Sequence, residues 1–145
     1  MIRGAAKIIR TGLEVGSTPF WEWPLHCQGW TDKSFQEIAD MLPASIRVDG
    51  CTVGVRHSHG PHVGELAFKP WRIRSVNESA LQRFRGLRCQ HSVRHPPLLG
   101  GTPAATAYYP KPFAKRYVKG LHASKNTSQT ILNDIKLALQ LGPAP

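Results

Sequence analysis

The sequence contains few acidic residues, few cysteines and no long apolar segment. Its 145 residues include nine Asp and Glu and three cysteines, and 41% are hydrophobic, which is typical of a globular protein. No stretch approaches the roughly 18 consecutive apolar residues of a membrane-spanning helix, so we expect no membrane insertion. Three widely spaced cysteines do not form a secreted disulfide framework, which predicts an intracellular protein of the cytoplasm or nucleus. Residues 1–16 are basic like a mitochondrial presequence, but their apolar stripe indicates an ordinary packed helix.

The positive charge is concentrated in one segment. The net charge is +10, and residues 69–125 hold twelve basic residues and one acidic residue, Glu78. Such a segment predicts a nucleic acid or another polyanion as partner, and the alternative is a solvated basic surface. Trp71 among these cations is typical of single-strand binders, although it also has the strand parity of a core residue. The predicted binding residues are Lys69, Trp71, Arg72, Arg74, Arg83, Arg85, Lys111, Lys115, Arg116 and Lys119.

Apolar periodicity predicts alternating helices and strands. Helices are expected over 2–14, 32–42, 77–88, 112–121 and 127–141, and strands over 18–23, 45–55 (as a pair) and 68–76. Alternation early in the chain and helices late in it predict an α/β fold, a partial Rossmann-like open mixed sheet with a helical C-terminal part. We expect a single domain over 1–145 with its core at about 15–121. It is either complete or half of a larger domain that self-associates or needs a partner chain.

The apolar pattern changes parity at Gly50. Ile46 and Val48 alternate with polar residues, whereas Cys51 and Val53 have the opposite parity. A two-residue hairpin at 49–50 would return both pairs to one face of a sheet. A β-bulge at Gly50 is the alternative.

Cysteine and histidine residues gather in the segment after residue 88. Cys89, His91 and His95 provide three of the four ligands that Zn²⁺ requires, and Cys27 or Cys51 would provide the fourth. The chain has no Cys-x-x-Cys pair, so a buried Cys89 beside exposed loop histidines is the alternative. Zinc is the one cofactor that the sequence suggests.

Three further groups have weaker chemical signals. His57, His59 and His62 form a less favourable metal set in a Gly-rich loop, and Cys51 is either a core residue or a reactive thiol. Glu22 is the one acid in an apolar, aromatic strand, where a charge is costly unless it is paired or functional. Backbone N–H groups or Arg72 could satisfy that carboxylate.

Three stretches occur in order and together resemble a known group of sequences. They are residues 20–24 with Trp30, residues 48–51 with 69–73, and residues 88–89 with His95 and Gly100. The combination resembles the C-terminal half of uncharacterised Rossmann-like, cytosine methyltransferase-like proteins in mobile-element polyproteins of algae and marine invertebrates. The resemblance implies that Glu22 is a base-holding catalytic carboxylate. The chain has no Pro-Cys dipeptide and no Gly-rich cofactor loop, which favours a domain without catalysis.

Three functions follow from these patterns. The first is a non-catalytic domain, derived from a mobile element, that binds nucleic acid through residues 69–119 without sequence preference. The second is a methyltransferase-like enzyme fragment that a partner chain completes. The third is a small zinc-stabilised interaction module.

Overall fold

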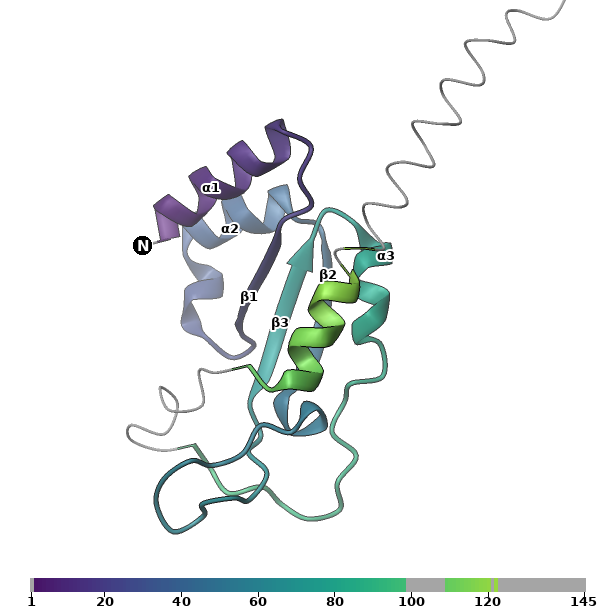
Figure 1. Ribbon diagram of the computed structural model, residues 1–145. Helices are drawn as coiled ribbons and strands as arrows, with labels where there is room; N and C mark the ends of the chain where they lie inside the picture. Colours follow the sequence, from purple (N-terminus) through teal and green to yellow (C-terminus); the bar gives the residue numbers. More distant parts are fainter. Residues whose placement is uncertain (1, 99–108, 121, 123–145) are drawn as a thin grey trace, which may run out of the picture.

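The computed structural model describes residues 2–98, 109–120 and 122. The helices are α1 (Ile2–Glu14), α2 (Lys33–Met41) and α3 (Glu78–Leu81), the strands are β1 (Phe20–Pro24), β2 (Ala44–Asp49) and β3 (Pro70–Ser75), and the 3₁₀ helices are η1 (Gln28–Thr31), η2 (Gly50–Val53) and η3 (Gln82–Phe84). A further helix covers residues 111–120 (Figure 1). The helix predicted over 127–141 lies outside the described residues. Within the described ranges, no helix is long and apolar enough to cross a membrane.

Local side-chain capping starts two of the helices. The Asp32 carboxylate accepts a hydrogen bond of 2.7 Å from the Ser34 N–H, and the Asn77 side chain accepts one of 2.9 Å from the Ser79 N–H. Both caps satisfy N–H groups that a helix start leaves without partners. The single helix predicted over 77–88 is shorter than expected, because α3 tightens into η3, which ends at Phe84.

The three strands form an antiparallel sheet in the order β1-β3-β2. In the centre Ile73 of β3 pairs with Glu22 of β1 on one side and with Ile46 of β2 on the other. The predicted Rossmann-like mixed sheet was therefore wrong, because neighbouring strands run in opposite directions and none of them pairs in parallel. The fold remains α/β, with a helical segment after the sheet.

The connection from β1 through α2 to β2 explains the error. β1 and β2 are each antiparallel to β3, so they run in the same direction, as the two strands of a β-α-β unit do. Along the sequence, the order strand-helix-strand is the same as in a unit whose two strands are adjacent and parallel. Here β3 lies between them, so the unit is split.

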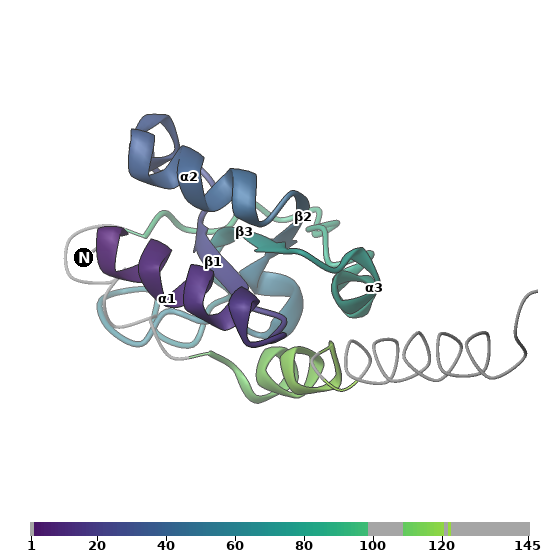
Figure 2. The same ribbon diagram turned by 90° about the horizontal axis from the view of Figure 1, so that it is seen from above.

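Helices cover both faces of the sheet, as Figures 1 and 2 show. On one face α1 and α2 pack on each other and on Trp21, around the buried side chains of Ala6, Ile9, Ile38 and Leu42. On the other face Trp71 and Ile73 of β3 pack against Phe84 and Phe113. Strand alternation accounts for this division, because successive side chains of β1 and β3 point to opposite faces.

Neither the hairpin nor the bulge predicted at residues 49–50 forms. After β2 the chain turns into η2, which buries Gly50, Cys51 and Val53, and Gly54 ends η2 in the left-handed region at φ 89°. A 3₁₀ turn re-aims side chains without any strand pairing, and this explains the change of parity at Gly50.

Candidate metal centre

The turn after β2 places Cys51 in the interior. The Gly50 N–H donates to the Lys69 carbonyl at 2.9 Å, and the Thr52 hydroxyl donates to the Asp49 carbonyl at 2.6 Å. A Cβ at position 50 would meet the Lys69 carbonyl oxygen at 2.8 Å, so this approach requires glycine. The Cys51 side chain that follows is buried, with 4% exposure.

The Asp49 carboxylate brings residue 89 to this turn. It accepts hydrogen bonds from the Cys89 N–H at 2.9 Å and from Nε of Arg47 at 2.7 Å. A second Arg47 nitrogen lies 3.2 Å from its other oxygen, Oδ2. The Asp49 N–H in turn donates to the Leu87 carbonyl at 2.8 Å. Asp49 thus holds the segment 87–89 against the end of β2 through both its side chain and its backbone.

Four ligand atoms converge at this point. One donor atom each from Cys51, Cys89, His91 and His95 lies within 4.8 Å of all the others. The Cys89 Sγ lies 3.3 Å from His91 Nδ1 and 3.3 Å from His95 Nε2. The His95 ring also stacks on Phe68 with an angle of 8° between the ring planes, which limits its rotation. Two thiols and two imidazoles are a donor set typical of a structural zinc site.

The environment of Cys51 bears on its protonation. Burial, together with the smaller effects of the neighbouring Cys89 and the Asp49 carboxylate, raises the pKa of the Cys51 thiol to about 12. The free thiol is therefore the stable form at neutral pH, and a bound metal ion would have to displace its proton. The candidate ligands run from buried Cys51 through half-buried Cys89 and His95 to exposed His91, so the cluster reaches the surface at His91.

The structure brings together the three residues of the sequence-based metal prediction. Cys89, His91 and His95 lie together, and Cys51, the second of the two proposed partners, completes the set. Cys27 lies elsewhere, where its sulfur accepts a hydrogen bond of 3.3 Å from the Gly29 N–H at the start of η1. The role of Asp49 was missed, although its place near the end of a strand and two residues before Cys51 was visible in the sequence.

The histidines of the loop 56–67 make other contacts. His57 is buried and its Nε2 lies 3.3 Å from the Pro96 carbonyl oxygen. His59 Nδ1 lies 2.9 Å from the Ser58 hydroxyl, and His62 Nδ1 lies 3.1 Å from the Glu65 carboxylate. Among the described residues these histidines belong to no metal-like cluster.

Glu22 lies on the face of the sheet opposite Arg72. The two alternate in the paired strands β1 and β3, where Glu22 pairs with Ile73 and Arg72 pairs with Trp23. The Glu22 carboxylate instead accepts a hydrogen bond from the Tyr109 hydroxyl. Burial raises the pKa of Glu22, while the bond from Tyr109 and the charge of Lys69 lower it by less.

The predicted nucleic-acid residues are divided among different environments. Trp71 is buried at 2% exposure. Arg74 donates to the carbonyls of Leu42 at 2.8 Å and Ala39 at 3.0 Å, where it caps the end of α2. The Arg72 guanidinium lies 5.0 Å from the centre of the Trp30 ring.

The other cations of this set are partly or fully solvent-facing. Lys69 is half-buried before β3. The exposed members lie on η3, on the residue that follows it and on helix 111–120; they are Arg83, Arg85, Lys111, Lys115, Arg116 and Lys119. Helix 111–120 lies across the sheet from the face that carries Arg72 and Arg74 (Figure 2).

No protein-family model matches the chain, and no curated protein or solved structure matches it significantly. The resemblance to mobile-element proteins therefore stays a prediction. The antiparallel sheet removes the Rossmann-like fold on which the assignment of Glu22 as a base-holding carboxylate depended.

Proposed function

We propose that this protein is a small zinc-stabilised interaction module in which Cys51, Cys89, His91 and His95 bind one Zn²⁺ ion. The observation that carries the proposal is the convergence of two sulfur and two nitrogen donors within 4.8 Å. Four protein ligands fill a tetrahedral zinc site and leave no position for a substrate. The proposed role is therefore structural and not catalytic.

The geometry supports zinc over harder cations. Thiolate and imidazole ligands select zinc, whereas magnesium and calcium require oxygen. Zinc–sulfur and zinc–nitrogen bonds of about 2.3 and 2.0 Å place tetrahedral ligand atoms about 3.3–3.8 Å apart. A shift of about 1 Å in the widest pair would thus bring the four atoms to bonding distance.

Zinc would join two segments that are far apart in the sequence. Cys51 belongs to η2, and the other three ligands belong to the irregular segment after Leu87. The free energy of metal binding then adds to the free energy of folding, because the unfolded chain does not hold the four ligands together. Such a cross-link would add stability to a protein whose three-stranded sheet provides only a small core.

Metal analysis of protein purified without an affinity tag tests the proposal. We expect one zinc per chain, and Co²⁺ in its place should give the visible absorption of a tetrahedral sulfur-containing site. Replacing exposed His91 by Ala, together with Cys89→Ser, should abolish both signals. Cys27→Ser is the matched control, because Cys27 lies outside the cluster, and it should keep full zinc content. A wild-type protein that retains no zinc and shows no cobalt spectrum would refute the proposal.

Binding of a polyanion is a second candidate function, and the exposed cations of helix 111–120 favour it. Lys111, Lys115 and Lys119 are spaced by four residues and so lie along one side of this helix. Arg116 donates to the Arg83 carbonyl at 2.9 Å, which joins this helix to η3 and its cations. Exposed lysine and arginine side chains attract phosphate groups without recognising particular bases.

Fluorescence anisotropy with labelled single-stranded and double-stranded oligonucleotides tests the second candidate. Binding should weaken steeply with salt. Neutralising Lys115, Arg116 and Lys119 with glutamine should reduce the slope of log K against log salt by about 2–3. The matched control replaces three exposed cations near α1 and α2, namely Arg3, Lys7 and Lys33. Equal binding at low and high salt, or equal loss in both triple variants, would contradict an interface on helix 111–120.

A further inference from the structure

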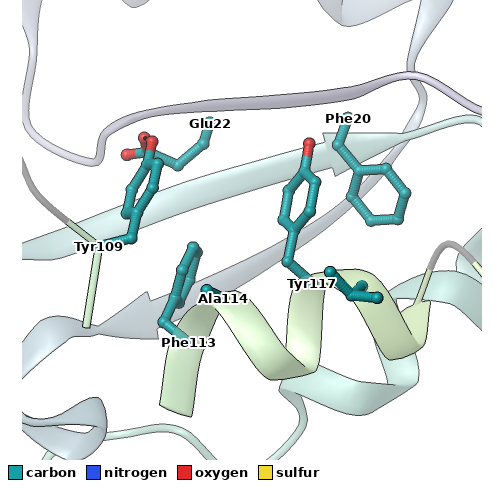
Figure 3. Close-up of a pocket in the computed structure, with 7 residues that line it drawn as sticks. Phe20, Glu22, Tyr109, Phe113, Ala114 and Tyr117 are labelled. Atoms are coloured by element: carbon teal, nitrogen blue, oxygen red, sulfur yellow. Dashed lines mark hydrogen bonds between the residues drawn. The ribbon is translucent and has the colours of Figure 1, made fainter. Parts of the chain in front are cut away.

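A pocket lies on the face of the sheet that carries Trp71 and Ile73, between β1 and the segment 109–118. It is a pocket of about 370 Å³ with seven lining residues, Phe20, Glu22, Tyr109, Phe113, Ala114, Tyr117 and Val118. Figure 3 shows side chains from the strand and from the helix pointing into the same space. The volume is at the lower end for a ligand site, which indicates a small ligand or a single side chain.

Four aromatic rings form the walls of this aromatic pocket. Phe20 and Tyr117 make one pair, with ring centres 4.8 Å apart, and Tyr109 and Phe113 make a second pair at 4.9 Å. The two pairs meet where Phe113 and Tyr117 lie 6.4 Å apart. The face of an aromatic ring carries partial negative charge, so a space bordered by several rings favours a cation.

A carboxylate completes the polar end of the pocket. Glu22 accepts a hydrogen bond from Tyr109, and both groups lie on the same side of the pocket (Figure 3). The Tyr117 hydroxyl points toward β1, and the Glu22 charge raises the pKa of Tyr117, after the larger effect of burial. Lys69 lies beside Glu22 in a neighbouring cavity with Trp71, and it does not line the aromatic pocket. Among the described residues that line the pocket, the one formal charge is thus negative, in a protein of net charge +10.

We infer that the aromatic pocket binds a methylated ammonium group, with the rings around its methyl groups and the Glu22 carboxylate beside its charge. A neutral apolar ligand would gain no attraction from the Glu22 carboxylate, and an anion would be repelled by it. A methylated ammonium suits the pocket better than a bare one, because it is weakly hydrated and apolar on its surface. This inference is independent of the zinc site, since no residue of the metal cluster lines the pocket.

Choline and its neutral carbon isostere, 3,3-dimethylbutan-1-ol, provide the test. We expect choline to shift the amide signals of residues 20–22, Tyr109, Lys111 and residues 113–118 in NMR spectra of the ¹⁵N-labelled full chain. The isostere has the same shape without the charge, and it should bind at least about tenfold more weakly. Equal binding of both compounds, or no binding of choline, would overturn the inference.

Matched variants assign the binding to the rings and the carboxylate. Glu22→Gln keeps an acceptor for the Tyr109 hydroxyl and should weaken choline binding about tenfold, whereas Glu78→Gln, outside the pocket, should have no effect. Tyr117→Phe keeps the ring and should retain binding, and Tyr117→Leu should lose it. Amide spectra report whether each variant is folded. Retained choline binding in the Glu22→Gln or Tyr117→Leu protein would overturn the inference.

Discussion

Replacing Asp49 by asparagine should destabilise the protein and weaken the metal site together. The carboxylate is 3% exposed, and it accepts hydrogen bonds from Arg47 at 2.7 Å and from the Cys89 N–H at 2.9 Å. Asparagine has a similar shape, but it has no charge and offers one acceptor oxygen in place of two. At least one of these donors would lose its partner, and Arg47 would lose its counter-charge.

The magnitude follows from the burial of the two partners. Breaking a fully buried ion pair costs about 3–5 kcal/mol, but Arg47 is 29% exposed and water would partly replace its partner. We therefore expect a loss of about 2–3 kcal/mol in the free energy of unfolding, a large share of the roughly 5–15 kcal/mol typical of a domain. Zinc affinity should fall by about 10–100-fold, as is usual when a group that orients metal ligands is lost.

Equilibrium unfolding in urea, with and without added zinc, measures both effects. Asp40→Asn is the control, because it makes the same charge change at an exposed position. Zinc affinity is measured by competition with a chelator of known affinity. Free energies of unfolding within about 0.5 kcal/mol for the two variants would refute the structural role of Asp49. Normal stability with weakened zinc binding would confine that role to the metal site.

Three further predictions concern glycine positions and Glu22. Gly50→Ala should cost about 1–3 kcal/mol in the free energy of unfolding, because its Cβ would meet the Lys69 carbonyl oxygen at 2.8 Å; unchanged stability would contradict the close approach. Gly4→Ala lies in α1 with open space around its Cβ, and it should stabilise by about 0.5–1 kcal/mol in the same urea assay; a loss would show strain in α1. The pKa of Glu22 is raised above 4.5 in the folded state, so the protonated form favours folding and this contribution is lost as pH rises through the raised pKa. The Glu22→Gln protein should therefore gain stability relative to wild type between pH 4.5 and neutral pH, and a constant difference across that range would contradict the effect of burial.

Part of the Cys/His cluster was visible in the sequence, and part of it was not. Cys89, His91 and His95 lie within seven residues, so any fold of that segment keeps them near one another. The fourth ligand had two candidates, Cys27 and Cys51, and nothing in the local sequence distinguishes them. The hydrogen bond from the Cys89 N–H to Asp49 selects Cys51, and it joins residues 40 positions apart. Such a contact depends on the whole fold.

For the basic segment, too, the sequence showed one part and the fold decided the other. Its charge was evident from composition, but the separation of Arg72 and Arg74 from Lys111, Lys115 and Lys119 depends on which face of the sheet each residue occupies. Strand alternation placed the arginines opposite Trp71, yet the position of helix 111–120 on the Trp71 face follows from the packing of Phe113. A pattern of charges along a chain therefore does not define a surface.

The sequence by itself determined the helix starts and the apolar faces, because these depend on contacts within a few residues. Asp32 and Asn77 cap helices through N–H groups two positions away, and the stripe of α2 buries Phe35 and Ile38 as expected. Tertiary structure alone decided the strand order and the fourth member of the Cys/His cluster. The energy of backbone pairing is similar whichever strand lies next to a given strand. The place of β3 between β1 and β2 therefore follows from the combined packing of both helical layers.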